Sequence, residues 1–199
     1  MMAMGGFVLA VIALLAVPGP TNTLLAASGA AIGLRRSLRL IPAEISGYLI
    51  AIGCLLAVVQ PLAAAHPAVP VVSKLVASAY LAWTAVRLWQ DGGAELMSVP
   101  APASPGRVFL TTLLNPKALI FAFVIFPRTG LTTLAPHAAI FAGLVAAIGG
   151  GWIGLGDLIA RSAAGTATPR RISRLAAIAL GVFATLIASS AVARVGHPR

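Results

Sequence analysis

The residues of this chain that could do chemistry are polar and ionisable groups set in long apolar segments. Lys117 lies near the centre of the apolar stretch 107–127 and directly follows Asn115 and Pro116. An ionised lysine at the centre of a bilayer costs about 2.5–3.5 kcal/mol, so such a residue usually faces a bundle interior or an aqueous cavity. Pro116 frees a backbone carbonyl one turn earlier, and Asn115 offers an amide in the same break. These residues predict a binding site, and the alternative is that Lys117 snorkels to an interface.

A second candidate site lies in residues 1–34, which contain no charged side chain. A continuous helix of that length would measure about 51 Å, against a hydrocarbon core of about 30 Å. Pro18, Gly19 and Pro20 interrupt the stretch, and they predict a broken helix. The half-helix after the break, which contains Asn22, would direct free N–H groups and a positive dipole end at a carboxylate. The alternative is a kink that only allows the helices to pack.

Glu44 and Asp157 are the only acidic residues near the apolar segments. Either carboxyl could bind an ammonium group or exchange a proton. Structural pairing explains them equally well, because Asp157 lies four residues before Arg161 and Glu44 follows Arg36 and Arg39. Both residues are therefore candidates for proton coupling or for ion pairing.

Other kinds of chemistry find little support in the sequence. It contains no pair of nucleophile and base, no phosphate-binding loop and no cluster with metal-ligand spacing. Cys54 is the single cysteine, which excludes a two-thiol redox cycle within one chain. We therefore expect no enzyme activity, no cofactor and no metal site. His66 and His137 are interpreted as ordinary residues of outer loops.

The composition identifies the kind of structure that must position these residues. The chain has 199 residues, of which 59% are hydrophobic and 9% are charged, and its mean hydropathy is +0.99. Soluble domains contain about 25% charged residues, so the sequence predicts an all-α integral membrane protein. The net charge of +10 does not call for a nucleic-acid partner, because the arginines cluster between apolar runs as they do in cytoplasmic loops.

The apolar runs predict six transmembrane helices in one membrane domain, residues 1–199. The spans are expected at about 4–30, 41–63, 69–89, 107–127, within 129–156, and at 175–193. Gln60 and Pro61, with residues 66–70, are interpreted as a turn after the second span. Residues 91–106, rich in proline and glycine, predict a flexible loop between two halves.

The distribution of Lys and Arg predicts the orientation of the spans. Nine of them lie in the first, third and fifth loops, and four lie on the other side, leaving out Lys117. Cytoplasmic loops carry the excess of positive charge, so both termini are predicted outside the cytoplasm and the loop 91–106 inside.

The two halves, residues 1–90 and 107–199, show signs of duplication. Residues 73–79 and 173–179 share four identities at an offset of 100, and Pro18 and Pro116 are 98 residues apart. Each half has three predicted spans, so the second copy would be inverted in the membrane. Inverted repeats with matching broken helices place a substrate site near the midplane in secondary transporters. The alternative is chance similarity between alanine-rich helices.

The pattern as a whole resembles the LysE/RhtB family of amino-acid exporters. The resemblance is carried by Pro18-Gly19-Pro20, by Ser73-Lys74-Leu75 leading to Ala79-Tyr80-Leu81, and by Asn115-Pro116-Lys117 leading to Phe126-Pro127. It implies export of amino acids or their derivatives driven by the proton motive force, with Pro18, Gly19, Pro20, Asn115, Pro116 and Lys117 in the central site. Thr21 departs from the family pattern, in which Asn or Asp is often found after Pro20.

The expected function is therefore secondary active export from the plasma membrane of a bacterium. The partners are a small-molecule substrate, the lipid bilayer and a coupled proton, and a homo-oligomer is left open. Alternatives are a metal-ion or other small-solute exporter of the same superfamily and a non-transporting membrane scaffold.

Overall fold

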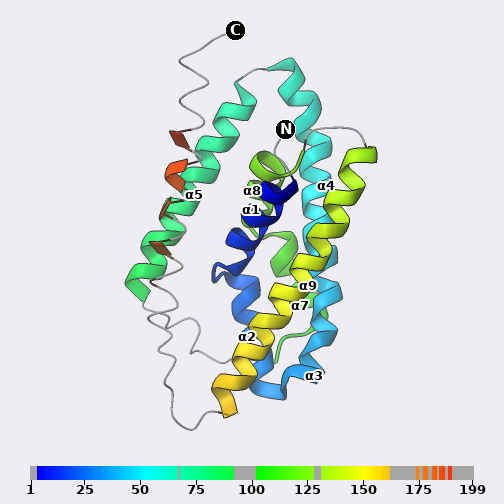
Figure 1. Ribbon diagram of the computed structural model, residues 1–199, viewed down its shortest axis with the longest axis vertical. Coiled ribbons are helices and arrows are strands. Elements are labelled where there is room, and N and C mark those ends of the chain that lie inside the picture. The colour runs from blue at the N-terminus through cyan, green and yellow to red at the C-terminus, as the bar shows by residue number, and fades with distance from the viewer. Residues whose placement is uncertain are drawn as a thin grey trace.

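All regular structure in the described part of the chain is helical (Figure 1). The computed structural model describes residues 4–66, 68–91, 102–127 and 131–161. It also describes ten residues of the C-terminal stretch, namely Arg174, Ala177, Ile178, Gly181, Val182, Ala184, Thr185, Leu186, Ala188 and Ser189. The all-α prediction is confirmed for these residues.

The chain begins with a bent pair of helices, α1 (Met4–Ala16) and α2 (Pro20–Ile32), whose axes differ by 63°. Gly19 is extended, with φ −165° and ψ 177°, and Pro20 is the first residue of α2. Proline suits the first helical position because its missing N–H is unpaired there in any case. The predicted break at Pro18–Pro20 is confirmed. The pair ends at Gly33, whose φ of 82° lies in the left-handed region that favours glycine.

Two short helices, α3 (Leu34–Ser37) and the 3-10 helix η1 (Leu38–Leu40), lead into the long helix α4 (Ile41–Ala65). The predicted turn at Gln60 and Pro61 is wrong, because α4 continues through both residues. A proline near a helix end removes one backbone hydrogen bond, and membrane helices tolerate that loss. The next helix, α5 (Val69–Asp91), closely matches the third predicted span.

A second bent pair follows, with an angle of 50° between α7 (Pro105–Leu113) and the segment Lys117–Ile125. Ser104 caps α7, since its hydroxyl oxygen accepts a hydrogen bond of 3.2 Å from the Arg107 N–H. After the break, α8 (Lys117–Ile120) continues as the π-helix η2 (Phe121–Ile125). The predicted break in this span is confirmed.

Two boundaries from the sequence need correction. The predicted loop 91–106 is shorter at both ends, because α5 includes Asp91 and Ser104–Pro105 is the start of a helix. Residues 92–101 of that loop lie outside the described part of the chain. Helix α9 (Leu131–Arg161) begins early enough to include His137, which is therefore not in an outer loop.

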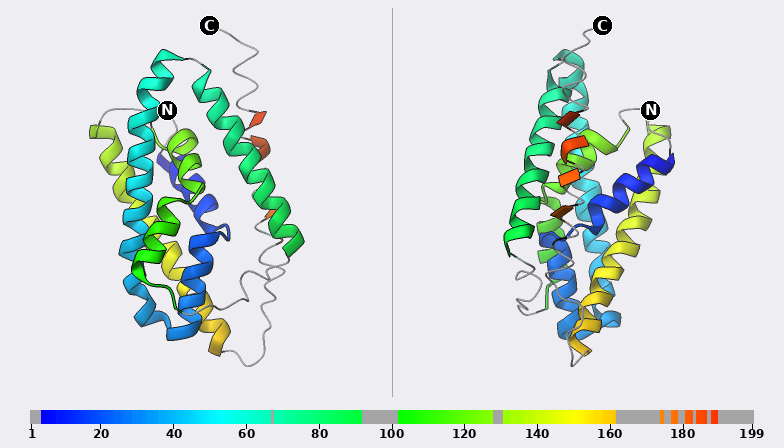
Figure 2. Two further views of the ribbon diagram at one scale, coloured as in Figure 1. Left: turned by 180° about the vertical axis from the view of Figure 1, so that it is seen from behind. Right: turned by 60° about the vertical axis from the view of Figure 1, so that its left-hand side comes forward.

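Among the described residues, two helices are long and apolar enough to cross a membrane, Leu34–Val58 and Thr133–Arg161, and the number rises to four if each bent pair is one span. These four match the first, second, fourth and fifth predicted spans. The third, α5, contains Lys74, Arg87 and Asp91, which lower its hydropathy. About half of the sixth, 175–193, falls outside the described residues. In Figure 2, α4, α9 and the two bent pairs form a bundle, and α5 stands at its side.

Helices α2 and α9 cross so closely that glycine is required at two positions. A Cβ atom at Gly29 would lie 2.0 Å from the carbonyl oxygen of Ile153, and one at Gly156 would lie 1.9 Å from that of Ala26. Small residues allow such backbone contact between membrane helices. The crossing fixes the second half of the first bent pair against α9.

The first half is held by a cluster of aromatic side chains. Phe7 of α1 packs edge-on against Phe126, and Phe141 of α9 packs against Phe121, Phe126 and Tyr48. Ring centroids in these contacts are 4.8–5.8 Å apart, the range of favourable edge-to-face pairs. The cluster brings α1, α4, η2 and α9 together around the two breaks.

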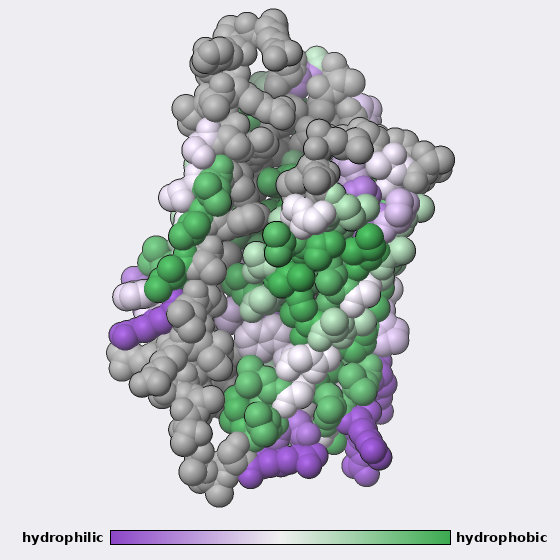
Figure 3. All heavy atoms as spheres, in the orientation of Figure 1, coloured by the Kyte–Doolittle hydropathy of each residue, from purple (hydrophilic) through white to green (hydrophobic). Residues whose placement is uncertain are grey.

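The outer surface combines an apolar belt with a positive end. Large apolar side chains such as Leu9 of α1 and Val58 of α4 are 70% and 66% exposed, as lipid-facing residues of a membrane helix are. Exposed arginines gather where α3, the start of α7 and the end of α9 meet (Figure 3): Arg35, Arg36, Arg39, Arg107 and Arg161. The chain is an integral membrane protein by this distribution and by its apolar helices.

Candidate functional site

The two helix breaks lie against each other inside the bundle. Lys117 begins α8 directly after the second break, and its side chain is only 3% exposed. Its Nζ atom donates a hydrogen bond of 2.5 Å to the carbonyl oxygen of Val17, in the first break. A Cβ atom at Gly19 would lie 3.2 Å from both Nζ and Cε of Lys117. The lysine therefore occupies the gap between the two halves of the first bent pair and does not reach an interface.

Asn22 closes the first break from the other side. Its side-chain nitrogen donates to the carbonyl oxygens of Leu15 at 2.8 Å and Val17 at 2.7 Å. These oxygens lie at the C-terminal end of α1, which ends at Ala16, so they have no helical partners. Val17 thus accepts hydrogen bonds from both Asn22 and Lys117. Pro18, Gly19 and Pro20 shape the backbone that presents this carbonyl.

Asn115 connects the second break to two other helices. Its side-chain nitrogen donates to the hydroxyl oxygens of Thr21 in α2 and Tyr48 in α4, each at 3.1 Å. Its side-chain oxygen accepts from the backbone N–H of Lys117 at 3.0 Å, across Pro116. The three side chains of this network, Thr21, Tyr48 and Asn115, are buried, with Tyr48 at 0% exposure. The amide therefore fixes the start of α8 against the start of α2.

Thr112 completes what we call the polar cluster, defined as Thr21, Asn22, Tyr48, Thr112, Asn115 and Lys117. The hydroxyls of Thr21 and Thr112 lie 3.2 Å apart, and Thr112 also donates to the Val108 carbonyl at 2.8 Å. Gly47 of α4 allows α7 to lie close to α4 here, since a Cβ atom at Gly47 would lie 2.9 Å from the Cβ of Thr112. The cluster offers hydroxyl, amide and ammonium groups in one buried region.

Sequence reasoning missed Thr21, Tyr48 and Thr112 as site residues. Thr112 precedes Pro116 by four residues and Tyr48 follows Glu44 by four, so each shares a helix face or turn with a residue already singled out. A polar side chain four residues from a candidate site residue in an apolar helix is a sequence feature that could have indicated Tyr48 and Thr112.

Glu44 is buried in α4 with 1% exposure, and its Oε2 atom has no hydrogen-bond partner. A Cβ atom at Gly149 of α9 would lie 2.4 Å from that oxygen, so the carboxyl is pressed against the α9 backbone. Among the described residues, no ion pair joins Glu44 to Arg36 or Arg39. Glu44 does interact electrostatically with Lys117. The cluster and this carboxyl thus place an amine and a carboxyl group in one buried region.

Asp157 lies elsewhere, in the last turns of α9. Its carboxylate is bound by the Arg161 guanidinium through contacts of 2.9 Å from Nε and from one terminal nitrogen. The Arg161 side chain is 72% exposed, so this is a surface ion pair at the positive end of the bundle. The structure does not bring Asp157 together with the polar cluster.

A cavity of about 360 Å³ opens between α4 and the second break. It is lined by Ala51, Cys54 and Leu55 of α4 and by Leu113, Leu114, Asn115, Pro116, Ala118 and Leu119. Asn115 belongs to both the cavity wall and the polar cluster. Through Asn115 this cavity reaches the polar cluster.

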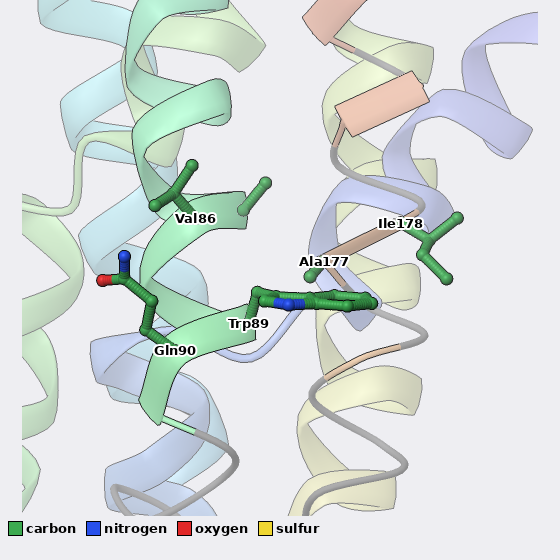
Figure 4. A pocket seen from close by; sticks show the side chains of 6 residues that line it. Val86, Trp89, Gln90, Ala177 and Ile178 are labelled. Atoms are coloured by element: carbon green, nitrogen blue, oxygen red, sulfur yellow. The ribbon is translucent and has the colours of Figure 1, made fainter.

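Another cavity, of about 340 Å³, lies between α5 and the C-terminal residues Ala177 and Ile178 (Figure 4). Its walls are almost wholly apolar, and the indole of Trp89 extends from α5 toward Ala177 and Ile178. The Arg174 guanidinium lies 5.3 Å from the Trp89 ring centroid, a cation–π contact. None of the predicted site residues lines this cavity.

Comparison with known proteins identifies one family. The family model described as LysE type translocator matches residues 12–191, which include both breaks and the polar cluster. No curated protein and no solved structure matches the chain. Within the described residues, no group of three His, Cys, Asp or Glu side chains could hold a metal ion.

Proposed function

Because the chain belongs to the LysE type translocator family, and is thus a membrane transporter of small solutes, we propose that it exports amino acids or small amino-acid derivatives. The observation that carries this proposal is the buried contact between Lys117 and the Val17 carbonyl in the broken helix α1–α2. The Lys117 ammonium donates to a neutral backbone carbonyl. A stronger hydrogen-bond acceptor on a substrate can replace that carbonyl as its partner.

A substrate carboxylate is such an acceptor. A charge-assisted hydrogen bond from an ammonium to a carboxylate is about twice as strong as one between neutral groups. When the carboxylate binds Lys117, the Val17 carbonyl still accepts from Asn22, so no buried polar group is left unpaired. The N–H groups at the start of α2 add the positive end of a helix dipole to the same place.

Glu44 supplies the opposite charge that an amino-acid zwitterion needs. Its carboxyl lies within electrostatic range of Lys117, and one of its oxygens is free to accept. In this mechanism the substrate ammonium binds Glu44 in the loaded state, and a proton replaces the substrate there during the return. Inward movement of that proton couples export to the proton motive force.

Alternating access follows from the two bent helices. Their breaks are 98 residues apart in sequence, counted from Pro18 to Pro116, and are bent by 63° and 50°. Matching breaks support six spans arranged as two inverted repeats, with the linker 91–106 between them. Rocking of one repeat against the other exposes the polar cluster first to one side and then to the other.

The orientation and location follow from the positive end of the bundle. Cytoplasmic ends of membrane helices carry the excess of Lys and Arg, so the end with Arg35, Arg36 and Arg161 faces the cytoplasm. Both termini then lie outside the cytoplasm of a bacterial cell, in its plasma membrane. Asp157 contributes an ion pair at that end in this arrangement.

The test is transport in everted membrane vesicles, which load export substrates inward. Labelled amino acids are offered to vesicles with this protein and to vesicles with the Lys117→Ala variant, each with and without a proton gradient. Accumulation that needs both the gradient and Lys117 is the expected result. If no amino acid accumulates in vesicles that contain folded, inserted wild-type protein, the proposed function is wrong.

A further inference from the structure

The cavity beside the second break continues directly from the polar cluster. Asn115 donates to Thr21 and Tyr48 on its inner side, and the same residue lines the cavity on its outer side. A small molecule that reaches Asn115 from the cavity therefore has polar groups at one end and the cavity walls at the other.

One face of α4 runs through both regions. Glu44, Tyr48, Ala51 and Leu55 are spaced by four, three and four residues, which places them on one helix face. With a rise of about 1.5 Å per residue, this face extends for about 16 Å. Its first half carries a carboxyl and a phenol, and its second half carries only apolar side chains.

We propose that this cavity is the subsite for the substrate side chain and that it selects neutral aliphatic amino acids over basic or acidic ones. The inference rests on the proposed function and names the substrate class of that same site. No residue that lines the cavity is charged, and Leu55, Leu113 and Leu119 contribute to its wall. A charged side chain would lose hydration there without gaining a partner, which is costly, whereas an aliphatic one gains apolar contact.

The size of the cavity agrees with a single side chain rather than a large ligand. Its volume of about 360 Å³ is at the lower end of the range of roughly 300–1,000 Å³ for small-molecule sites. Ala51 sets the depth next to the polar cluster, since it is the smallest wall residue on α4 and is 6% exposed. A larger residue at this position removes room that a branched substrate needs.

The first test compares labelled leucine, alanine, lysine and glutamate in everted vesicles that contain the full chain. We expect leucine to exceed lysine and glutamate by about 10-fold or more, the discrimination that even one methylene gives in an apolar pocket. Lysine transport equal to that of leucine would overturn the inference while leaving the exporter function intact.

Two variants change the cavity in opposite directions. Ala51→Leu is expected to lower the ratio of leucine to alanine transport by roughly 10-fold, and Leu55→Ala is expected to extend transport to phenylalanine. Gly53→Ala is the matched control on α4, because a Cβ atom at Gly53 meets nothing within 4 Å and the residue does not line the cavity. A fold defect lowers transport of every substrate, so selectivity unchanged in both variants contradicts the inference.

Cys54 provides a readout of binding that does not require transport. It is an exposed free thiol in the cavity wall, and it is the single cysteine of the chain. N-Ethylmaleimide should label it, leucine should slow that labelling, and lysine should not, while Cys54→Ser should give no signal. Protection by leucine without transport would uphold the subsite and reject the exporter function. Absence of protection by leucine, or equal protection by lysine, would overturn the subsite.

Discussion

The Nζ atom of Lys117 donates its hydrogen bond to the carbonyl oxygen of Val17, a residue 100 positions earlier in the chain. Each of these residues stands at a helix break, so the contact joins the two breaks directly. Val17 also accepts from Asn22, which makes its carbonyl a shared acceptor for two buried donors. Lys117 can therefore bind another partner without leaving the Val17 carbonyl unpaired.

Lys117→Met should therefore strongly lower the rate of transport while the protein still folds and inserts. Loss of a hydrogen bond to a charged group costs about 1.5–3 kcal/mol, which corresponds to roughly a 10- to 100-fold fall in transport. The measurement is the initial rate of substrate uptake in everted vesicles at matched protein levels. Arg161→Ala, at an exposed site remote from the polar cluster, is the control that should transport normally. Uptake by Lys117→Met at the wild-type rate would reject the role of Lys117.

Glu44→Gln should separate binding from proton coupling. The amide fits the same space against Gly149 but cannot take up or release a proton. We expect the variant to lose the additional uptake that a proton gradient drives, and its transport to lose its dependence on pH. Exchange of labelled for unlabelled substrate without a gradient should continue, because it needs no net proton movement.

The matched control for that experiment is Asp157→Asn, which removes the other acidic residue near the apolar segments. Asp157 is paired with the exposed Arg161 at the bundle end, and exposed ion pairs contribute about 0–1 kcal/mol. Gradient-driven uptake and stability should both stay near their wild-type values. If Asp157→Asn abolished coupling and Glu44→Gln did not, the two carboxyls would have to exchange their assigned roles.

The helix breaks could be predicted from the sequence because their causes are local. Pro18 and Pro116 each lack a backbone donor, and no tertiary contact can restore it. Lys117 could be placed in the interior for a similar reason, since burial in lipid without a partner is costly. The hydrogen-bond partner of Lys117 could not be predicted, because it is a backbone carbonyl 100 residues earlier in the chain. Every residue has such a carbonyl, so the residue type at position 17 does not indicate the contact.

Other errors came from reading local signals without the packing around them. Pro61 and the residues around His137 were interpreted as turn or loop, but α4 and α9 continue through them. The ring of His137 is buried at 7% exposure, with its Nδ1 atom 2.7 Å from the Thr133 carbonyl oxygen and its edge against Phe7. Thr21 was noted only as a departure from a family pattern, although it links α2 to Asn115. For His137 and for Thr21, a contact between distant helices decides the outcome.

Gly156→Ala should destabilise the protein, because the new Cβ would lie 1.9 Å from the Ala26 carbonyl oxygen. A backbone atom cannot move aside as a flexible side chain can, and overpacking of this kind costs about 1–3 kcal/mol. Unfolding by denaturant in detergent micelles measures the change. Gly154→Ala on the same helix is the matched control, since a Cβ atom there meets nothing within 4 Å. Equal stability of the two variants would contradict the close crossing of α2 and α9.

The shared acceptor at Val17 predicts that Asn22 and Lys117 are energetically coupled. In Asn22→Leu the carbonyl keeps Lys117, and in Lys117→Met it keeps Asn22, but in the double variant the buried oxygen has neither donor. A buried unpaired acceptor costs about 1–3 kcal/mol, so the double variant should lose that much more stability than the sum of the two single variants. The four proteins are compared by denaturant unfolding in one detergent. A second cycle that combines Lys117→Met with Arg161→Ala should be additive within about 0.5 kcal/mol. Additivity in the first cycle would show that the two side chains do not share the Val17 carbonyl.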